Sequence, residues 1–244
     1  MALTDNIVSY WKLDESSGNA SDSVAANTAT NTNVTYTTGK INNWATFNGT
    51  NARFIAWSTI SGTTAFTLMA WVKAASKTKA WILTKRDSNA AWIMFRQQST
   101  AYQAFYLFSW GFVFAWVWTI TCFDNTRHHI AVTRSWTAIK SYVDWVLDLN
   151  WTASSNMSLV THWMKFGNDS VDNVWLNWMM DEVGVWNRAL TQSEIQEIYN
   201  SWTWLQYPFA AATSIKTVNW LAKASVKTVK DLAIASVKTI NDLA

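Results

Sequence analysis

The stretch that decides the fold is Phe66-Thr67-Leu68-Met69-Ala70-Trp71-Val72-Lys73. Every second residue from Phe66 to Val72 is apolar, so a pleated backbone would place these side chains on one face. This period of two is typical of a half-buried β-strand rather than of a helix. We therefore expect a strand over residues 66–73.

The same alternation recurs on both sides of this strand, from residue 7 to about residue 185. His129–Thr133 and Ile139–Val143 are further predicted strands. Between the predicted strands, stretches such as Asp14–Asn33 and Asp87–Ala90 are rich in Asn, Ser, Thr and Asp, and we expect them to contain turns. Many short strands with regular turn signals predict an all-β fold made of two antiparallel sheets, a β-sandwich of the jelly-roll type.

One segment has helical rather than strand spacing. Thr191 is followed three residues later by Glu194, which is the pattern of a capping box. Apolar residues then follow at Ile195, Ile198 and Tyr199. The sequence thus predicts one short helix near 191–199 that closes the domain.

An eleven-residue repeat occupies the C-terminal segment, where Ser214-Ile215-Lys216-Thr217-Val218 recurs from Ser225 and again from Ser236 with small changes. A period of eleven corresponds to about 3.67 residues per helical turn and suits a helical assembly. We expect residues 214–244 to serve self-association or docking to a larger assembly. A low-complexity tail and a stack of short strands are the alternatives.

Composition excludes several classes of protein. The 244 residues carry a net charge of +3 with only 14% charged residues, and no basic cluster points to nucleic acid. No apolar run is long enough for a membrane span. The single cysteine, Cys122, excludes an internal disulfide. Residues 1–5 lack the features of a secretory signal, so we expect synthesis in the cytoplasm or an export signal outside this sequence.

Seven motifs, in order, resemble those of one superfamily. They are Tyr10-Trp11-Lys12-Leu13-Asp14-Glu15, Phe47-Asn48-Gly49-Thr50, Phe66–Lys73, His128–Arg134, Tyr142-Val143-Asp144, Met180-Asp181-Glu182-Val183 and Trp186–Thr191. On these motifs the chain resembles the concanavalin A-like lectin/glucanase superfamily, in particular its LamG-like jelly-roll modules from bacterial surface and phage structural proteins.

The resemblance implies a division into three parts and a function. Residues 1–204 would form the LamG-like sandwich. Residues 205–213 would form a linker, and residues 214–244 would form the repeat tail. The module would be a non-catalytic recognition or adhesion domain that binds a glycan or cell-surface polysaccharide, located at an extracellular surface or on a virion. The alternative is a structural phage or surface-assembly protein, such as a decoration or tail protein, without a sugar ligand.

Glycine and tryptophan are present in unusual numbers. The chain has 7 glycines and 19 tryptophans, whereas about 17 glycines are average for this length. Compared with the resembling family, several tryptophans occupy positions where the family has glycine; the clearest are Trp136, Trp145, Trp178, Trp202 and Trp204. One hypothesis is that UGA encodes glycine in this gene and was translated here as tryptophan. The alternative is that the tryptophans are genuine.

The sequence predicts no catalytic residues. Glycosidases of this superfamily carry carboxylates at a fixed spacing on one strand because retaining hydrolysis needs two of them about 5 Å apart. Here Asp181 and Glu182 are adjacent, and adjacent strand residues are expected to point to opposite faces. The pair His128 and His129 is expected to be structural for the same reason.

The resemblance implies a structural calcium ion between an early polar loop and a late strand. Asp22 and Asp181 best match the two positions, and Asn27 and Thr30 are expected to add oxygen ligands. Calcium prefers carboxylate and carbonyl oxygens of this kind.

A glycan site combines an aromatic surface with amide or carboxylate groups that bind hydroxyls. On this basis the candidate contact residues are Asp87, Asn89, Tyr102 and Asp124.

Overall fold

The protein is described by a computed structural model. The structure describes residues 1–57, 60, 64–74, 80–86, 91–97, 103–109, 112–117, 119–153, 163–169, 174–175, 177–200 and 205–209. The predicted tail, 214–244, lies outside these residues.

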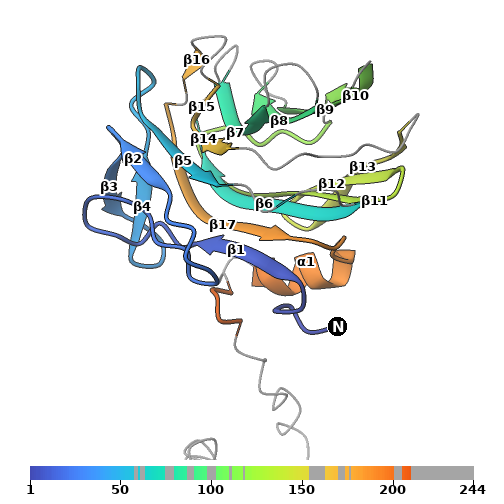
Figure 1. The fold of residues 1–244 in the computed structure, drawn as a ribbon, viewed down its shortest axis with the longest axis horizontal. Coiled ribbons are helices and arrows are strands. Elements are labelled where there is room, and N and C mark those ends of the chain that lie inside the picture. The colour runs from blue at the N-terminus through green and yellow to red at the C-terminus, as the bar shows by residue number, and fades with distance from the viewer. Residues whose placement is uncertain are drawn as a thin grey trace, which may run out of the picture. The chain divides into compact units, whose positions relative to one another are not determined.

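The described strands form two large antiparallel sheets (Figure 1). The first sheet has the order β13 (Val146–Thr152), β12 (Ala138–Val143), β11 (Arg127–Ser135), β6 (Ala65–Lys73), β17 (Met179–Trp186), β4 (Asn43–Thr46) and β3 (Thr35–Thr38), with β1 (Ile7–Trp11) also paired to β17. The second sheet has the order β10 (Phe112–Val117), β9 (Gln103–Ser109), β8 (Ala91–Gln97), β7 (Ala80–Arg86), β14 (Trp163–Phe166), β5 (Arg53–Trp57) and β2 (Thr30–Thr32). A small ladder joins β15 (Asn168–Asp169) to β16 (Val174–Trp175).

The two sheets pack face to face around the larger hydrophobic core. The core takes every second side chain of β6, from Phe66 to Val72, as the alternation predicts. Ala74, which follows β6, and Ile130 and Val132 of β11 belong to the same core. Phe54 and Phe166, which pair with each other in the second sheet, make an aromatic contact on that side of the core. The predicted all-β sandwich is thus confirmed.

The outer face of the first sheet is also buried, which the alternation in β6 did not predict. The helix α1 (Gln192–Tyr199) lies on this face, on the side away from the second sheet (Figure 1). Tyr199 stacks on Trp71 with ring centroids 5.6 Å apart, and Ile195 and Ile198 pack in a second core cluster with Met69. Side chains on both faces of β6 are therefore buried.

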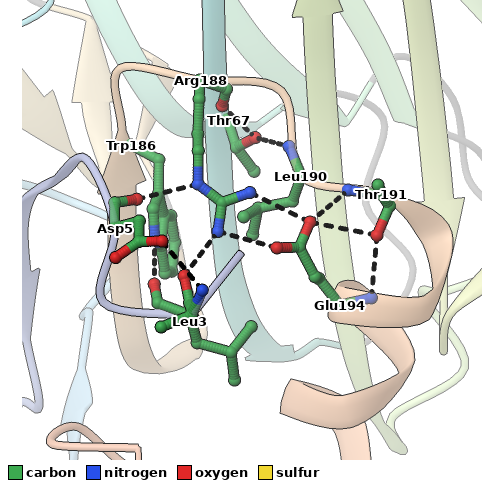
Figure 2. Close-up of polar contacts among 9 residues, drawn as sticks. Leu3, Asp5, Thr67, Trp186, Arg188, Leu190, Thr191 and Glu194 are labelled. Atoms are coloured by element: carbon green, nitrogen blue, oxygen red, sulfur yellow. Dashed lines mark hydrogen bonds and ion pairs between the residues drawn. The ribbon is translucent and has the colours of Figure 1, made fainter.

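Polar contacts attach α1 and the N-terminus to this face, as Figure 2 shows. The predicted capping box is present, since Thr191 Oγ1 accepts a hydrogen bond from the Glu194 amide and the Glu194 carboxylate accepts one from the Thr191 amide. Arg188 donates to the carbonyl oxygens of Ala2 and Asp5 and pairs with Glu194 at 2.8 Å. A buried arginine with several hydrogen bonds holds its partners in a fixed arrangement.

The domain extends to Phe209. Tyr207 and Phe209 pack against Tyr10, with ring centroids 5.7 and 5.4 Å away. Residues 205–209, expected to begin the linker, are therefore part of the sandwich domain in this structure.

Two tight turns of the first sheet place tryptophan in the left-handed backbone region. Val143 pairs with Val146, so Asp144 and Trp145 form a two-residue turn, with φ of 50° and 66°. Positive φ at both positions is required for a type I′ turn, where Asp-Gly is strongly preferred. A bulky side chain at positive φ is a strained exception. The backbone at Trp145 therefore suits glycine.

The turn between β11 and β12 has the same property. Ser135 pairs with Ala138, and Trp136, the first of the two residues between them, has φ of 55°. The two-residue II′ turn has glycine at this first position. The Trp136 side chain is 62% exposed and thus gains little from burial.

The remaining tryptophans at suspected glycine positions are Trp178, Trp202 and Trp204. Trp178 is buried in the main core against Phe123, and it is not among the residues with positive φ. Its backbone gives no support to the recoding hypothesis. Trp202 and Trp204 lie outside the described residues. The hypothesis of translated glycine codons is supported at the two turns and stays a prediction elsewhere.

Trp136→Gly is expected to be more stable than Trp136→Ala by about 1 kcal/mol, because only glycine relieves the positive φ. Chemical denaturation of both variants measures this difference. The comparison with alanine separates the backbone effect from the loss of the indole.

The matched control is Trp151, which is exposed on β13 at an ordinary strand φ. Here glycine is expected to be less stable than alanine by about 0.5–1 kcal/mol. Equal stability of Trp136→Gly and Trp136→Ala would contradict the strain at this turn. Peptide masses of the natural protein test the codon hypothesis itself, and tryptophan at positions 136 and 145 would end it.

Candidate functional site

Of the predicted glycan contacts, only Asp124 lies in the described part of the chain. Asp87, Asn89 and Tyr102 lie outside it. Asp124 precedes β11, where its Oδ1 accepts hydrogen bonds from the amide and the hydroxyl of Thr126. It thus caps a short loop, Asp124–Thr126, at one end of the first sheet, and the hydrogen bonds to Thr126, together with His128, lower its pKa to about 2 despite partial burial.

This loop borders a cleft at the rim of the sandwich. Two adjoining hollows of about 190 and 390 Å³ share Lys73 and Asn125. The residues that line them come from the ends of β4, β6, β11 and β17: Thr46, Phe47, Lys73, Ala74, Asn125, Thr126, Arg127, Asn177, Trp178 and Met179. We refer to this surface as the rim cleft.

Backbone hydrogen bonds hold both walls of the rim cleft. The Asn125 amide donates to the Ala74 carbonyl oxygen at 2.7 Å. On the other wall, Phe47 and Trp178 exchange two backbone hydrogen bonds. Exposed polar side chains, those of Asn125 and Asn177, therefore project from backbone that is fixed by the sheet, which favours binding of a polar ligand.

The motif Phe47-Asn48-Gly49-Thr50 supports Asn177. The Asn48 carboxamide oxygen accepts hydrogen bonds from the amides of Thr50, Asn51 and Ala52 and closes the loop. Gly49 has φ of 71°, and a Cβ there would lie 2.7 Å from Cβ of Asn177. A glycine is needed for this close approach. The motif thus has a positioning role at the cleft.

His128 connects the cleft loop to the neighbouring turn. Its Nδ1 lies 2.7 Å from Asp144 Oδ2, and its Nε2 lies 3.1 Å from Asp124 Oδ1. Burial alone would lower the pKa of His128, but these two carboxylates raise it above its usual value. The ion pairs therefore stabilise the fold fully at low pH and are lost as the pH rises through the raised pKa.

His129 has a different role. It packs against Trp71 at a ring distance of 5.2 Å, and complete burial lowers its pKa to about 3. The two histidines have separate surroundings, as expected for neighbours on a strand, and both are part of the packed structure.

A second cluster of functional groups lies where β17 changes its partner strand. Met179 and Met180 pair with β4, whereas Val183–Trp186 pair with β1 on the same edge. At the junction, carboxylate oxygens of Asp14, Asp181 and Glu182 all lie within 4.8 Å of one another. We call these three residues the acidic cluster.

A β-bulge brings the two adjacent carboxylates together. The register with β6 shifts between Asp181 and Gly184, and Glu182 has φ of 51°. The expectation that Asp181 and Glu182 point to opposite faces was therefore wrong, because it assumed regular pleating and a bulge breaks the alternation.

Burial dominates the electrostatics of the acidic cluster. It raises the pKa of Asp181 well above its usual value, with the charge of Glu182 as a further cause, and it raises the pKa of Glu182 to about 7. Gln206 donates hydrogen bonds to both Glu182 and Asp14, which covers the cluster from the 205–209 segment. One oxygen on each carboxylate, Asp14 Oδ1, Asp181 Oδ2 and Glu182 Oε2, is buried without a hydrogen-bond partner among the described residues.

These oxygens fit a hard cation by their chemistry, because calcium takes carboxylate oxygens and would satisfy the buried acceptors. The predicted ligand set is only partly assembled. Asp181 belongs to the acidic cluster, but Asp22 lies on the other edge of β1, where its Oδ1 accepts from the Tyr10 and Val24 amides.

The other two predicted calcium ligands make contacts with β5 of the second sheet. The Asn27 side chain donates to the Trp57 carbonyl oxygen and accepts from the Trp57 amide. Thr30 pairs with Ile55 in the second sheet. Sequence reasoning missed Asp14 and Glu182, although both stand within the motifs that carry the family resemblance.

The two antiparallel sheets, packed face to face, define a β-sandwich. A sequence profile of the concanavalin A-like lectin/glucanases superfamily matches residues 47–196, more than half of the chain. The protein belongs to this superfamily. No curated protein sequence matches it, and no helix in the described part of the chain is long and apolar enough to cross a membrane.

Solved structures with the same fold are distant in sequence. The binding domain of Paraclostridial Mosquitocidal Protein 1 superposes with a TM-score of 0.70 at 15% identity, over 82% of this chain and 53% of that domain. The botulinum neurotoxin serotype G binding domain gives 0.68 at 12%, over 81% and 51%. Domain 4 of AbnA, an extracellular arabinanase from Geobacillus stearothermophilus solved with arabinotriose, gives 0.64 at 18%, over 79% and 97%. The chain thus spans about half of the two toxin domains and nearly all of the arabinanase domain.

The raised pKa of Glu182 makes stability depend on pH. Unfolded glutamate releases its proton near pH 4.3, whereas the folded protein keeps it to about pH 7. The folded state binds more protons in this window, so stability falls as the pH rises, by about 3 kcal/mol for Glu182 in the absence of bound metal. Glu182→Gln is expected to flatten this fall, as measured by denaturation in chelator between pH 4.5 and 6.5.

Glu197→Gln, a substitution on the exposed side of α1, is the matched control and should retain the wild-type slope. An unchanged slope in Glu182→Gln would mean that the carboxyl group is not titrating in the buried cluster.

Proposed function

We propose that the protein is a non-catalytic carbohydrate-binding module whose ligand enters the rim cleft. The observation that carries the proposal is the set of polar side chains, Lys73, Asn125 and Asn177, on rigid backbone beside an apolar floor. Carbohydrate sites combine such groups, because the hydroxyls need directional partners and the ring has apolar C–H faces. The arabinanase domain of the same fold, which was solved with arabinotriose, supports this proposal by analogy of fold alone.

The burial of the acidic cluster argues for binding without hydrolysis. Asp181 and Glu182 are close together, but their exposures are 0% and 1%. A glycosidase must bring both carboxylates into contact with the scissile bond. No substrate reaches them while Gln206 and the first sheet cover the cluster.

Calcium belongs to this proposal as a structural ion in the acidic cluster. Asp14, Asp181 and Glu182 would bind it, and its charge would hold the junction of β1, β4 and β17 together. Asp22, Asn27 and Thr30, the other calcium ligands predicted from the sequence, would cap loops and pair strands instead.

Calcium at about 100 times its Kd is expected to raise the melting temperature by about 5–10 °C at pH 7.5, because it binds only the folded state. Asp181→Asn is expected to remove this shift, and Asp22→Asn to retain it. Differential scanning calorimetry with calcium or chelator measures both variants. A full calcium response in Asp181→Asn would contradict a calcium site in the acidic cluster. Loss of the calcium response in Asp22→Asn alone would support the ligand set predicted from the sequence.

The proposed location is a cell surface or a virion, with residues 214–244 mediating self-association or attachment. Their eleven-residue repeat is the observation in favour of an assembly role. The second candidate function, a structural protein without a sugar ligand, rests on this same repeat.

The full-length protein is expected to bind glycans on an array, and deletion of residues 210–244 is expected to leave the specificity unchanged. Asn177→Ala and Asn125→Gly should each weaken binding about tenfold, since each removes hydrogen bonds to the ligand. Glycine suits position 125 because its φ is 66°. Isothermal titration with the best array ligand measures the loss.

The control for this experiment is the aromatic pair Trp57 and Trp163, exposed by 45% and 47% on the outer face of the second sheet. Trp57→Ala should leave binding unchanged. Loss of binding in Trp57→Ala but not in Asn177→Ala would move the site to the second sheet, and absence of any glycan ligand together with tail-dependent assembly would favour the structural function.

A further inference from the structure

The imidazole of His128 lies between carboxylates of two different segments. Its Nδ1 is 2.7 Å from Asp144, in the turn between β12 and β13, and its Nε2 is 3.1 Å from Asp124, in the loop before β11. We call this loop, Asp124–Thr126, the cleft loop. A neutral imidazole carries a proton on one nitrogen only, whereas an imidazolium donates hydrogen bonds from both. The geometry therefore fits the protonated form of His128.

The neighbouring hydroxyl of Thr126 agrees with the protonated form. Thr126 Oγ1 donates to Asp124 Oδ1 at 2.6 Å, and it lies 2.9 Å from Nε2 of His128. A hydroxyl group has one proton to donate. Since that proton goes to Asp124, Nε2 of His128 is the donor toward both neighbours.

The surroundings of His128 act on its proton in both directions. Burial opposes the proton, because the side chain is only 10% exposed, whereas the hydrogen bonds and charges of Asp144 and Asp124 favour it. On β6 the residue opposite His128 is the apolar Val72, and the next pair along the ladder, Lys73 with Arg127, projects toward the other face of the sheet. The net effect raises the pKa of His128 above its usual value.

The turn is the fixed side of this arrangement. The Asp144 amide donates to the His129 carbonyl oxygen at 2.8 Å, and Asp144 Oδ1 accepts from the His129 amide at 2.9 Å. On the other side, the cleft loop presents the exposed Asn125 to the rim cleft. His128 therefore connects a side chain of the cleft to a rigid turn.

Loss of one proton breaks this connection on the side of the cleft loop. Nδ1 keeps its hydrogen because its contact with Asp144 is the shorter one, and Nε2 then presents a lone pair to the Asp124 carboxylate. Two acceptors that face each other repel, and the Thr126 hydroxyl relieves the repulsion only by turning from Asp124 to Nε2. That turn removes one of the hydrogen bonds that close the cleft loop.

From this arrangement we infer that His128 is a positioning residue for the rim cleft, and that the cleft binds its ligand more tightly when both ring nitrogens of His128 carry protons. This inference rests on the proposed function and adds a pH dependence to it. The protonated form fixes the loop that carries Asn125 before the ligand arrives, and a ligand that binds a preformed site loses less entropy. Glycan affinity therefore falls as the pH rises through the pKa of His128.

The first test needs no ligand. Isotope-labelled full-length protein is titrated between about pH 6 and pH 9, and nuclear magnetic resonance follows the ring nitrogens of His128 and the backbone amides of Asn125 and Thr126. The ring is expected to titrate with a midpoint above about 6.5, the usual value for histidine, and the two amides with the same midpoint. Amides of the cleft loop that do not respond to the titration of His128 would contradict the positioning role.

The second test measures the affinity. Arabinotriose is the first probe and the best neutral ligand from the array is the next, because a ligand without charge cannot itself create a pH dependence. Titration calorimetry is expected to show about tenfold weaker binding at about pH 9 than at about pH 6, since one charge-assisted hydrogen bond is lost. The midpoint of this loss should coincide with that of the His128 ring.

Asp144→Asn separates the role of the proton from that of the fold. Asparagine tolerates the positive φ at this position and keeps an acceptor for the His129 amide, but it removes a charge that favours the proton. The midpoints of the ring, the amides and the affinity are expected to move together to lower pH. His128→Gln is expected to bind with an affinity that does not change with pH. Glu197→Gln, on the exposed side of α1, is the control and should keep the wild-type midpoint.

Three results would overturn the inference, and they differ in meaning. An affinity for the neutral glycan that is equal at both pH values would refute the role of His128 while the proposed function stands. A wild-type pH dependence that persists in His128→Gln, with the fold intact in thermal unfolding, would assign the titration to another group and would also leave the function standing. No glycan binding at any pH, on the array or in titration, would refute both.

Discussion

The pairing of β6 with β11 on one edge and β17 on the other is the constraint on which the rest of the structure depends. This ladder aligns Lys73 with Arg127 and with Met179, and so brings together three of the four strands whose ends line the rim cleft. The same ladder carries Trp71, on which Tyr199 of the closing helix stacks. Burial of β6 on both faces makes its register costly to change, because a shift of one residue would exchange the two faces.

The bulge in β17 has the opposite character, since it breaks the regular ladder at one place. It allows β17 to pair with β4 before the bulge and with β1 after it. The acidic cluster forms at this junction, with Gln206 above it. Bulges often reorient side chains next to functional sites. In this protein the bulge breaks the alternation of side chains along β17. The carboxylates of the adjacent residues Asp181 and Glu182 therefore lie close together in the acidic cluster.

Local patterns in the sequence predicted the elements but not their long-range consequences. The alternation from Phe66 to Val72 predicted β6, and Thr191 with Glu194 predicted the start of α1, because both signals depend on nearby residues only. The burial of Met69 and Trp71 required knowledge that α1 returns to this face. The pairing of Lys73 with Arg127 depends on register, which no local pattern gives. The predicted set of Asp22 and Asp181 failed to assemble in the acidic cluster because the strand β1 runs between them.

The two hairpin turns of the first sheet bear on the tryptophan and glycine content through their backbone conformation. Asp144-Trp145 and Trp136-Thr137 have backbone geometry that tight hairpins of this fold require, whatever side chain is present. The unusual ratio of tryptophan to glycine thus has a structural counterpart at these two turns. It also means that exposed tryptophans are weak indicators of a glycan site in this chain, and the polar rim cleft carries the functional argument.

The central claim, that a glycan binds at the rim cleft, is tested most directly by nuclear magnetic resonance. Isotope-labelled protein is titrated with the oligosaccharide that binds best on the array, and the backbone amide shifts are mapped on the structure. The account predicts that the largest changes occur at residues 73–74, 125–127 and 177–179. Changes concentrated at Trp57 and Trp163, or spread without a maximum at the rim, would contradict it.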